Sequence, residues 1–391
     1  MRHQKYFAAL AAFIAAATAF LSPWGLGLPG RLSLGPMLLA VAAYRFADFQ
    51  GNPPIHVYRA AAAKPQGVTP AQIKKAYNLP STGGKGTIAV IDAYDDATAE
   101  SDLAVFNAAY GLAACTTKNG CFEKHDMASS TGSSSGWSLE TALDVEWAHA
   151  IAPKAKILLV EAKTQSGANL MAAVDYAAAR KDVVAVSMSW GGAEFSDQLT
   201  YDPHFKSRSN GQPVFFAASG DDGAGVSWPA SAPNVVGVGG TTLVLASSTG
   251  KFVKELAWEG SGGGVSAYEK QPEYQAAYSI PKAAGMRAVP DVAYNADPAT
   301  GYPVYKTTGS YKNGWYTVGG TSAGAPQWAA IEALGASVSL AKIYADKASA
   351  GTLTFFRDIT SGLNGDCGYL CAARKRYDYV TGLGTPQTTK F

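Results

Sequence analysis

The residues Gly319–Pro326 have the composition expected around a nucleophilic serine. Gly319 and Gly320 let the backbone approach a ligand closely, and Ser322 lies where the apolar run that follows would begin a helix. The small residues beside it would allow that helix to pack tightly. A glycine–threonine–serine turn is also an ordinary helix cap, so both interpretations stay open at this point.

A nucleophilic serine needs a base, usually a histidine that a carboxylate orients. The chain has 5 His, and only His149 lies inside a convincing element, a predicted helix over residues 138–152. At about 100° per residue, Glu140 and Asp144 lie about 40° apart on one face, whereas His149 points about 180° away from Glu140. The two carboxyls are therefore the candidate base.

Two carboxyls at this spacing in an Ala-rich helix are costly, because like charges repel and both lose water. Sharing one proton relieves the repulsion. One carboxyl could then accept the serine proton while the other holds it in place, and such a pair would work best in acid. The alternative is a solvated helix face that carries Glu140, Asp144 and Glu146.

A tetrahedral intermediate also needs a hydrogen-bond donor for the developing oxyanion. The apolar run from Val214 leads into Ser219–Gly223, which delivers Asp221 and Asp222 into a glycine turn. Sheets of α/β proteins place functional groups at such turns. An aspartate donates only when protonated, which burial or low pH favours. A simple turn or a calcium loop would have a similar composition.

Alternating strands and helices must position these groups. Uninterrupted apolar runs, rather than alternating ones, are what a parallel sheet covered on both faces requires. Helical spacing separates these runs, and Thr69–Pro70 has the cap and first-turn proline of a helix start. The predicted fold class is therefore α/β, a parallel sheet covered by helices on both faces. The predicted strands are Thr87–Ile91, Ile157–Val160, Val183–Met188 and Val214–Ala218, and the predicted helices include Leu103–Ala109 and Ala168–Arg180.

Composition excludes several classes of protein. The chain has 391 residues, 47% of them hydrophobic and 16% charged, which excludes a disordered polymer. A net charge of +2 provides no field that would attract nucleic acid, so we expect no nucleic-acid partner. We expect a monomer.

The amino terminus has the pattern of an export signal. Arg2 and Lys5 precede the apolar run Phe7–Leu21, and Ala17–Ala19 offers small residues to a signal peptidase. The run is shorter than the roughly 20 residues of a bilayer-spanning helix, although a permanent anchor is the alternative. We expect a signal peptide over 1–19, a short leader or pro-segment over 20–65, and a main domain over 66–391. The mature protein would be secreted, with no stable membrane span.

An oxidising compartment favours disulfides between the 4 Cys, which fall as two local pairs. We expect Cys115 to bond Cys121 and Cys367 to bond Cys371. A metal site with His125, close after Cys121, is the rival, but it lacks the paired spacing of a structural zinc site.

Together these strings resemble the sedolisin family of serine-carboxyl peptidases, acid-active relatives of subtilisin with the subtilisin-like fold. The family's serine motif is similar to Gly320–Pro326 and implies that Ser322 is the nucleophile. Its helix motif implies Glu140 as general base with Asp144 as its partner, and its turn motif implies that Asp221 supports the oxyanion. Further matches, in the family's order, are residues 152–155, 189–192, 262–266 and 290–292.

The resemblance also implies a substrate cleft and one structural Ca²⁺. The cleft residues would be Ser189, Trp190, Gly191 and Gly320. The ion would bind Asp358 and Asp378, with carbonyl oxygens of Ile359, Arg374 and Arg376. Arg376 stands where the family commonly has glycine.

We therefore expect a secreted peptidase that cleaves protein or peptide substrates in acid through an acyl-enzyme on Ser322, as an endopeptidase or from amino termini. A subtilisin would require a histidine motif that the sequence lacks, so Asp92, at the end of the first predicted strand, is interpreted as a turn residue. The alternative function is a catalytically silent, secreted peptide-binding protein on the same fold.

Overall fold

The structure, a computed structural model, describes residues 44–127, 134–307, 313–346 and 354–387. The predicted signal peptide and the first part of the predicted leader lie outside these residues. No helix in the described part of the chain is long and apolar enough to cross a membrane.

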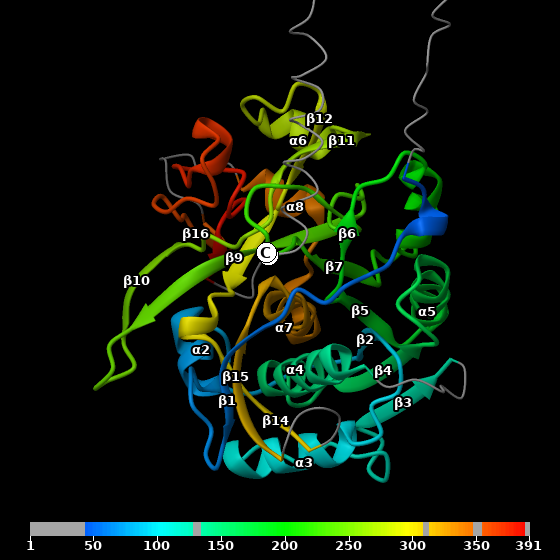
Figure 1. Cartoon of the computed structure of the whole chain (residues 1–391), viewed down its shortest axis with the longest axis vertical. Coiled ribbons are helices and arrows are strands. Elements are labelled where there is room, and N and C mark those ends of the chain that lie inside the picture. Colours follow the sequence, from blue (N-terminus) through cyan, green and yellow to red (C-terminus); the bar gives the residue numbers. More distant parts are fainter. Residues whose placement is uncertain (1–43, 128–133, 308–312, 347–353, 388–391) are drawn as a thin grey trace, which may run out of the picture. The chain divides into compact units, whose positions relative to one another are not determined.

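A largely parallel sheet forms the centre of the described unit (Figure 1). Its strands lie in the order β10-β9-β7-β5-β2-β4-β3, and β13 pairs with β9 outside this path. All the pairings are parallel except that of β10 with β9. The bounds are β2 Thr87–Ala93, β3 Phe122–Asp126, β4 Lys156–Ala162, β5 Val183–Met188, β7 Val214–Ala218, β9 Val235–Leu245, β10 Phe252–Ala257 and β13 Val292–Asn295.

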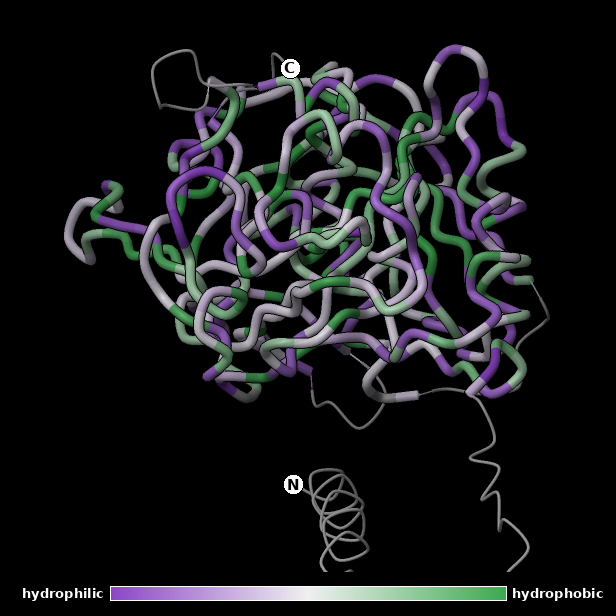
Figure 2. The backbone as a smooth tube through the Cα atoms, turned by 90° about the horizontal axis from the view of Figure 1, so that it is seen from above, coloured by the Kyte–Doolittle hydropathy of each residue, from purple (hydrophilic) through white to green (hydrophobic). Residues whose placement is uncertain are grey.

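Helices cover both faces of this sheet, which confirms the predicted fold class. In β2, Ile88 and Val90 belong to one core cluster and Ala89 and Ile91 to another, because successive side chains point to opposite faces. The first cluster includes α2 (Pro70–Ala76), α3 (Ala99–Tyr110), α4 (Ser135–Ile151) and α7 (Gly324–Ile331), and the second includes α5 (Gly167–Ala179). Hydrophilic residues gather along the peripheral loops (Figure 2).

The cap predicted at Thr69 is present in α2. The Thr69 hydroxyl accepts a hydrogen bond from the Gln72 backbone, and the Gln72 side chain accepts one from the Thr69 backbone. This reciprocal pair satisfies two backbone donors that the helix would otherwise leave open.

Smaller elements surround the central sheet. The described part of the predicted leader contributes η1 and β1, and β1 joins β15 and β14 in a three-stranded antiparallel sheet. The remaining bounds are η1 Phe46–Asp48, β1 His56–Ala62, β6 Gly192–Ala193, η2 Gln198–Phe205, β8 Ser227–Trp228, β11 Gly264–Lys270, α6 Glu273–Tyr278, β12 Met286–Val289, η3 Pro298–Thr300, β14 Tyr302–Lys306, β15 Gly314–Gly319, η4 Thr321–Ala323, η5 Glu332–Ala336, α8 Leu340–Ala345, β16 Phe356–Arg357, η6 Gly368–Cys371 and β17 Thr385–Pro386.

Both predicted disulfides are present, Cys115 with Cys121 and Cys367 with Cys371. The first disulfide uses both sulfurs that a metal site with His125 would need, and the His125 ring stacks on Tyr176 with the ring centroids 3.8 Å apart.

Candidate active site

Ser322 lies in the short turn η4, between the end of β15 and the start of α7. Ser322 is fully buried, and its hydroxyl donates a hydrogen bond to the Pro54 carbonyl oxygen at 2.8 Å. Gly320 has a φ of 133°, and a Cβ at this position would lie only 2.0 Å from the same oxygen. Glycine is therefore required here both by the backbone angle and by the close approach of Pro54.

Glu140 and Asp144 lie on α4, which is buried on all sides over residues 137–151 and packs against α7. Both residues are 0% exposed, so the alternative of a solvated helix face is wrong. Burial and the negative charge of Asp144 raise the pKa of Glu140 well above its usual value, and the Ser322 hydroxyl close by opposes this shift. The two acids therefore favour a state in which at least one carries a proton.

Ser189 connects this acid pair with the serine turn. Its hydroxyl oxygen lies 2.9 Å from Asp144 Oδ1 and 3.1 Å from the Ser322 carbonyl oxygen. Burial raises the pKa of Asp144, while the hydrogen bond with Ser189 lowers it. The structure thus brings together three residues that are far apart in the sequence.

Asp92 is a third acid beside this pair, and its interpretation as a turn residue is wrong. It lies within β2 and is 0% exposed. Burial and the charge of Asp144 raise the pKa of Asp92 well above its usual value. An acid at the carboxyl end of a buried parallel strand was the available signal, because such ends gather functional groups.

Asp221 lies in the loop after β7, and its side chain is 5% exposed. The Thr321 backbone N–H and hydroxyl both donate to Asp221 Oδ1 at 2.8 Å. His56 Nε2 lies 3.0 Å from Oδ2. Burial raises the pKa of Asp221, whereas His56 and Thr321 act in the opposite direction. No motif in the sequence singles out His56, because this histidine falls in the predicted leader.

Of the residues predicted for the substrate cleft, Trp190 has a buried side chain, whereas Gly191 offers its backbone for pairing. The Trp190 indole is fully buried and donates to the Ile91 carbonyl oxygen at 3.0 Å, so its side chain belongs to the core. Gly191 instead pairs through its backbone with Asn52, by hydrogen bonds of 3.0 and 3.1 Å. The backbone beside Gly191 can therefore accept an extended chain.

The predicted calcium residues lie in two loops that approach each other near the carboxyl end of the chain. Asp358 Oδ2 accepts a hydrogen bond from the Arg376 backbone, and Asp378 Oδ2 accepts one from the Arg374 backbone. Ile359, next to the first acid, is buried. Arg376 has a φ of 67°, the left-handed conformation that favours glycine. The backbone thus adopts a glycine-like geometry although an arginine is present.

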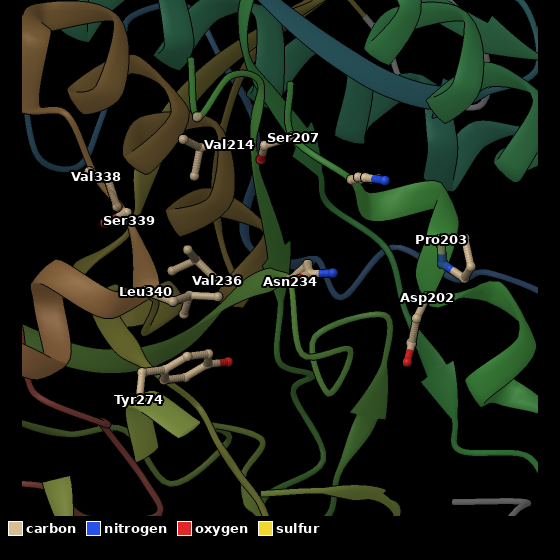
Figure 3. Close-up of a pocket in the computed structure, with 12 residues that line it drawn as sticks. Asp202, Pro203, Ser207, Val214, Asn234, Val236, Tyr274, Val338, Ser339 and Leu340 are labelled. Carbon is tan, nitrogen blue, oxygen red and sulfur yellow. The ribbon is translucent and has the colours of Figure 1, made fainter. Parts of the chain in front are cut away.

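Among the other candidate places for a site are a cluster of ligand atoms and a cavity. In the described part of the chain, the one cluster of three or more His, Cys, Asp or Glu ligand atoms is Cys115, Cys121 and His149, in which the disulfide uses both sulfurs. A cavity of ≈ 690 Å³ is lined by residues that include Val214, at the amino end of β7 (Figure 3). Because Asp221 follows the carboxyl end of β7, this cavity is separate from the acids and serine described above.

Comparisons with known proteins agree with this geometry. A family model described as the subtilase family matches residues 127–342. Kumamolisin of Bacillus sp. (strain MN-32) is 32% identical over 373 residues, which cover 84% of this chain and 63% of that protein. Sedolisin of Pseudomonas sp. (strain 101) is 28% identical over 379 residues, which cover 84% of this chain and 61% of that protein. The chain thus spans about three fifths of these relatives.

A solved structure of Pseudomonas sedolisin, a serine-carboxyl proteinase complexed with two molecules of pseudo-iodotyrostatin, superimposes with a TM-score of 0.67 at 27% identity. The superposition covers 83% of this chain and 96% of that one. The residues 127–342 that the family model matches include Glu140, Asp144, Asp221 and Ser322.

Proposed function

Since the chain belongs to the subtilase family and is a homologue of the sedolisin peptidases, we propose that it is a secreted, acid-active serine-carboxyl peptidase. One observation carries this proposal. Two fully buried acids on α4 lie beside a serine on a tight turn, and Ser189 links Asp144 to the backbone of that serine. No cation of the described residues pairs with these two buried carboxyls, an arrangement that costs stability and is typical of a functional site.

In the proposed reaction, Ser322 Oγ attacks the carbonyl carbon of the scissile peptide bond while Glu140 accepts the hydroxyl proton. The carbon–nitrogen bond then breaks, and the amine leaves with that proton. Water attacks the resulting ester, Glu140 again accepts the proton, and Ser322 regains its hydroxyl as the acid product leaves. Asp144 holds the proton-sharing carboxyl of Glu140 in position.

Asp221 supports the oxyanion in this proposal. Its buried carboxyl has a raised pKa, so in acid it carries a proton that it can donate to the developing negative charge. The two hydrogen bonds from Thr321 fix this carboxyl relative to the serine turn, because Thr321 immediately precedes Ser322. Both the oxyanion donor Asp221 and the proton-sharing pair of Glu140 and Asp144 would thus make the activity depend on low pH.

The residues of the two carboxyl-terminal loops fit one structural Ca²⁺. Asp358 Oδ1 is buried and has no hydrogen-bond partner among the described residues, and burial raises the pKa of Asp378 to about 7. A hard cation would stabilise both carboxylates. Asp358 and Asp378 would hold it with carbonyl oxygens of Ile359, Arg374 and Arg376. The ion would fix these loops and supply no chemistry to the reaction.

Secretion is supported by the predicted signal peptide and by the two disulfides, which persist in oxidising compartments. The substrates would be unfolded proteins or peptides, because the backbone of Gly191 can pair with an extended chain.

The test is hydrolysis of an unfolded protein at pH 4 and pH 7.5, followed by mass spectrometry of the products. Ser322→Ala should abolish turnover and leave the fold intact. Ser187→Ala is the matched control, because Ser187 is also fully buried and its hydroxyl has no hydrogen-bond partner among the described residues. Full activity of the Ser322 variant would refute the proposal.

A further inference from the structure

Lys74 carries a buried ammonium group without a counter-charge. It lies in the last turn of α2 and is only 7% exposed. Its Nζ donates to the Ser81 carbonyl oxygen at 2.9 Å, and no ion pair of the described residues includes Lys74. An ammonium group has three N–H donors, so two of them have no partner among the described residues. A buried, unpaired cation costs stability and is typical of a functional site.

A cavity of ≈ 590 Å³ lies beside this ammonium group, and Lys74 itself lines it. Its walls come from α2, from the loop that follows α2, and from the end of α3 with the residues after it. Lys75 is a second cation on the wall, whereas none of the described residues that line the cavity is an aspartate or a glutamate. The charges around the cavity are therefore positive, which favours an anionic ligand.

Tyr110, the last residue of α3, adds a hydrogen-bond donor to the wall of this cavity. Its hydroxyl oxygen is buried and has no hydrogen-bond partner among the described residues. The ring is held by Phe106 and Trp315, with the ring centroids 4.8 and 6.0 Å away. Burial, and then the negative charge of Glu146, raise the pKa of Tyr110, so this hydroxyl keeps a proton that it can donate to an anion.

His149 and Glu146, both on α4, interact with Lys74 and Tyr110 respectively, but neither of them lines the cavity. Burial lowers the pKa of His149, the hydrogen bond with the Ala113 carbonyl oxygen opposes this shift, and the charge of Lys74 lowers the pKa further. Burial raises the pKa of Glu146 well above its usual value, which favours its neutral form. The negative charge that would pair with Lys74 must therefore come from a ligand.

The remainder of the wall indicates which kind of anion fits. It includes the apolar side chains of Pro70, Leu79 and Leu112. A strongly hydrated inorganic anion would lose its water at these side chains without new hydrogen bonds to replace it. An organic anion can instead place its apolar part against them, and the volume of the cavity is in the range of small-molecule sites.

We propose that this cavity is a binding site for a small organic carboxylate, whose charged group contacts the Lys74 ammonium and the Tyr110 hydroxyl and whose apolar part lies against Leu79 and Leu112. The site does not depend on the proposed peptidase function, because none of these residues belongs to the proposed catalytic groups. Binding would neutralise the charge of Lys74 and supply the acceptor that Tyr110 lacks.

The first test is isothermal titration calorimetry of the full-length protein at pH 7 with phenylacetate as the probe. Phenylacetamide has the same shape and no charge, so it should bind at least about tenfold more weakly. Lys74→Met should weaken the binding of phenylacetate at least about tenfold, and this variant should fold because it removes a buried, unpaired charge. Lys181→Met is the matched control, because Lys181 is an exposed lysine after α5, and it should leave the affinity unchanged.

Tyr110→Phe removes only the hydroxyl and keeps the ring, so it should weaken the binding of phenylacetate by about three- to tenfold. Equal binding of phenylacetamide, unchanged affinity in the Lys74→Met protein, or no binding by the wild type would overturn the inference. Binding of inorganic phosphate more tightly than phenylacetate would overturn the assignment of the ligand as an organic carboxylate.

A second test uses pH, because only the charged form of Lys74 attracts the ligand. Burial lowers the pKa of Lys74 from its ordinary 10.5 to about 8, so the affinity of the wild type for phenylacetate should fall about tenfold from pH 7 to pH 9. The other titratable groups at this place are Lys75, His149, Tyr110 and Glu146. The pKa of His149 is lowered from 6.5 and that of Tyr110 is raised from 10.0, so neither group changes its charge in this range.

Lys74→Arg separates the titration of Lys74 from that of Glu146. A guanidinium group stays charged up to pH 9, so this variant should bind phenylacetate and lose the dependence on pH. An affinity of the wild type that does not fall from pH 7 to pH 9, or an equal fall in the Lys74→Arg protein, would overturn the inference.

Discussion

Two groups of buried carboxyls lie on the same side of the central sheet, and they differ in whether a cation pairs with them. Around Lys306, which is fully buried, the ammonium group contacts Asp96 Oδ1 at 2.6 Å and Asp102 Oδ2 at 2.8 Å. Beside Ser322, by contrast, Glu140, Asp144 and Asp92 are equally buried, and no cation of the described residues forms an ion pair with them.

The difference teaches that burial alone does not mark a functional acid. In the Lys306 group, one ammonium group offsets the charges of two carboxylates, and its contact with Asp102 connects α3 with β14. In the Ser322 group, the hydrogen bond with Ser189 stabilises the charge of Asp144 only in part, and a proton supplies the rest, which makes these acids able to take up and release protons. Of these two groups, the one with a cation is therefore a structural cluster, and the one without a cation is the candidate for proton transfer.

The largest effect should come from removal of one acid from the group beside Ser322, and this effect should be on activity. Glu140→Gln keeps the size of the side chain but cannot accept the Ser322 proton, so the rate of hydrolysis should fall by about 10²–10⁴-fold. Its stability should change little or increase slightly, because a buried repulsion disappears. Peptide hydrolysis and urea unfolding of the same preparation measure both quantities.

Glu332→Gln is the control for this substitution, because Glu332 is also a buried glutamate with a raised pKa but lies after α7, away from the serine turn. It should leave hydrolysis unchanged. A Glu140→Gln protein that lost several kcal/mol of stability and kept its activity would contradict this prediction. The cluster beside Ser322 would then be structural, like the cluster around Lys306.

Removal of the cation from the paired group should instead affect stability. Lys306→Met leaves Asp96 and Asp102 buried without a positive charge, and the free energy of unfolding should fall by about 3–5 kcal/mol. Lys254→Met, at an exposed position, should change it by less than about 0.5 kcal/mol. Urea titrations at pH 6 compare the two. A loss for Lys306→Met no larger than that of the control would mean that the buried pairs contribute nothing.

The same contrast should be visible in how stability depends on pH. Burial raises the pKa of Asp144 from its ordinary 3.8 to about 7, so the folded protein binds more protons than the unfolded chain in this range. Stability should therefore be greatest at low pH and fall as the pH rises from about 4 to about 7.

Because other buried carboxyls contribute to this slope, the informative quantity is the difference between wild type and Glu140→Gln. The substituted glutamine takes up no proton on folding, so the loss of stability from pH 4 to pH 7 should shrink by about 1–2 kcal/mol in the Glu140→Gln protein. Urea midpoints at three pH values give this difference. Parallel slopes for the two proteins would show that Glu140 does not take up a proton on folding.

Much of the scaffold was predictable because its signals are local. The strand Val183–Met188 and the strand Val214–Ala218 have the predicted bounds, since each is an unbroken apolar run between breakers. Each disulfide closes a short loop, so proximity in sequence identified the partners. The carboxyl pair on α4 was found because helical periodicity alone places Glu140 and Asp144 on one face.

The rest depends on contacts between distant segments, which no local pattern contains. Thr321 was treated as part of a motif, but its role is to donate two hydrogen bonds to Asp221, 100 residues earlier. His56 falls in the predicted leader, although β1 places it beside Asp221. Asp92 was misjudged because its neighbours at the strand end come from α4.

Asp92 offers the smallest and most specific prediction. Its negative charge raises the pKa of Glu140, so Asp92→Asn should lower that pKa and move the acidic limb of the pH–rate profile toward lower pH by less than about one unit. The maximal rate should change little, because Asp92 does not touch the reacting atoms in the proposed reaction. Asp182→Asn, at an exposed position, is the control and should leave the profile in place. A shift toward higher pH would mean that Asp92 is protonated throughout and stabilises the charged form of Glu140 through a hydrogen bond, which would place it inside the proton-sharing group and not beside it.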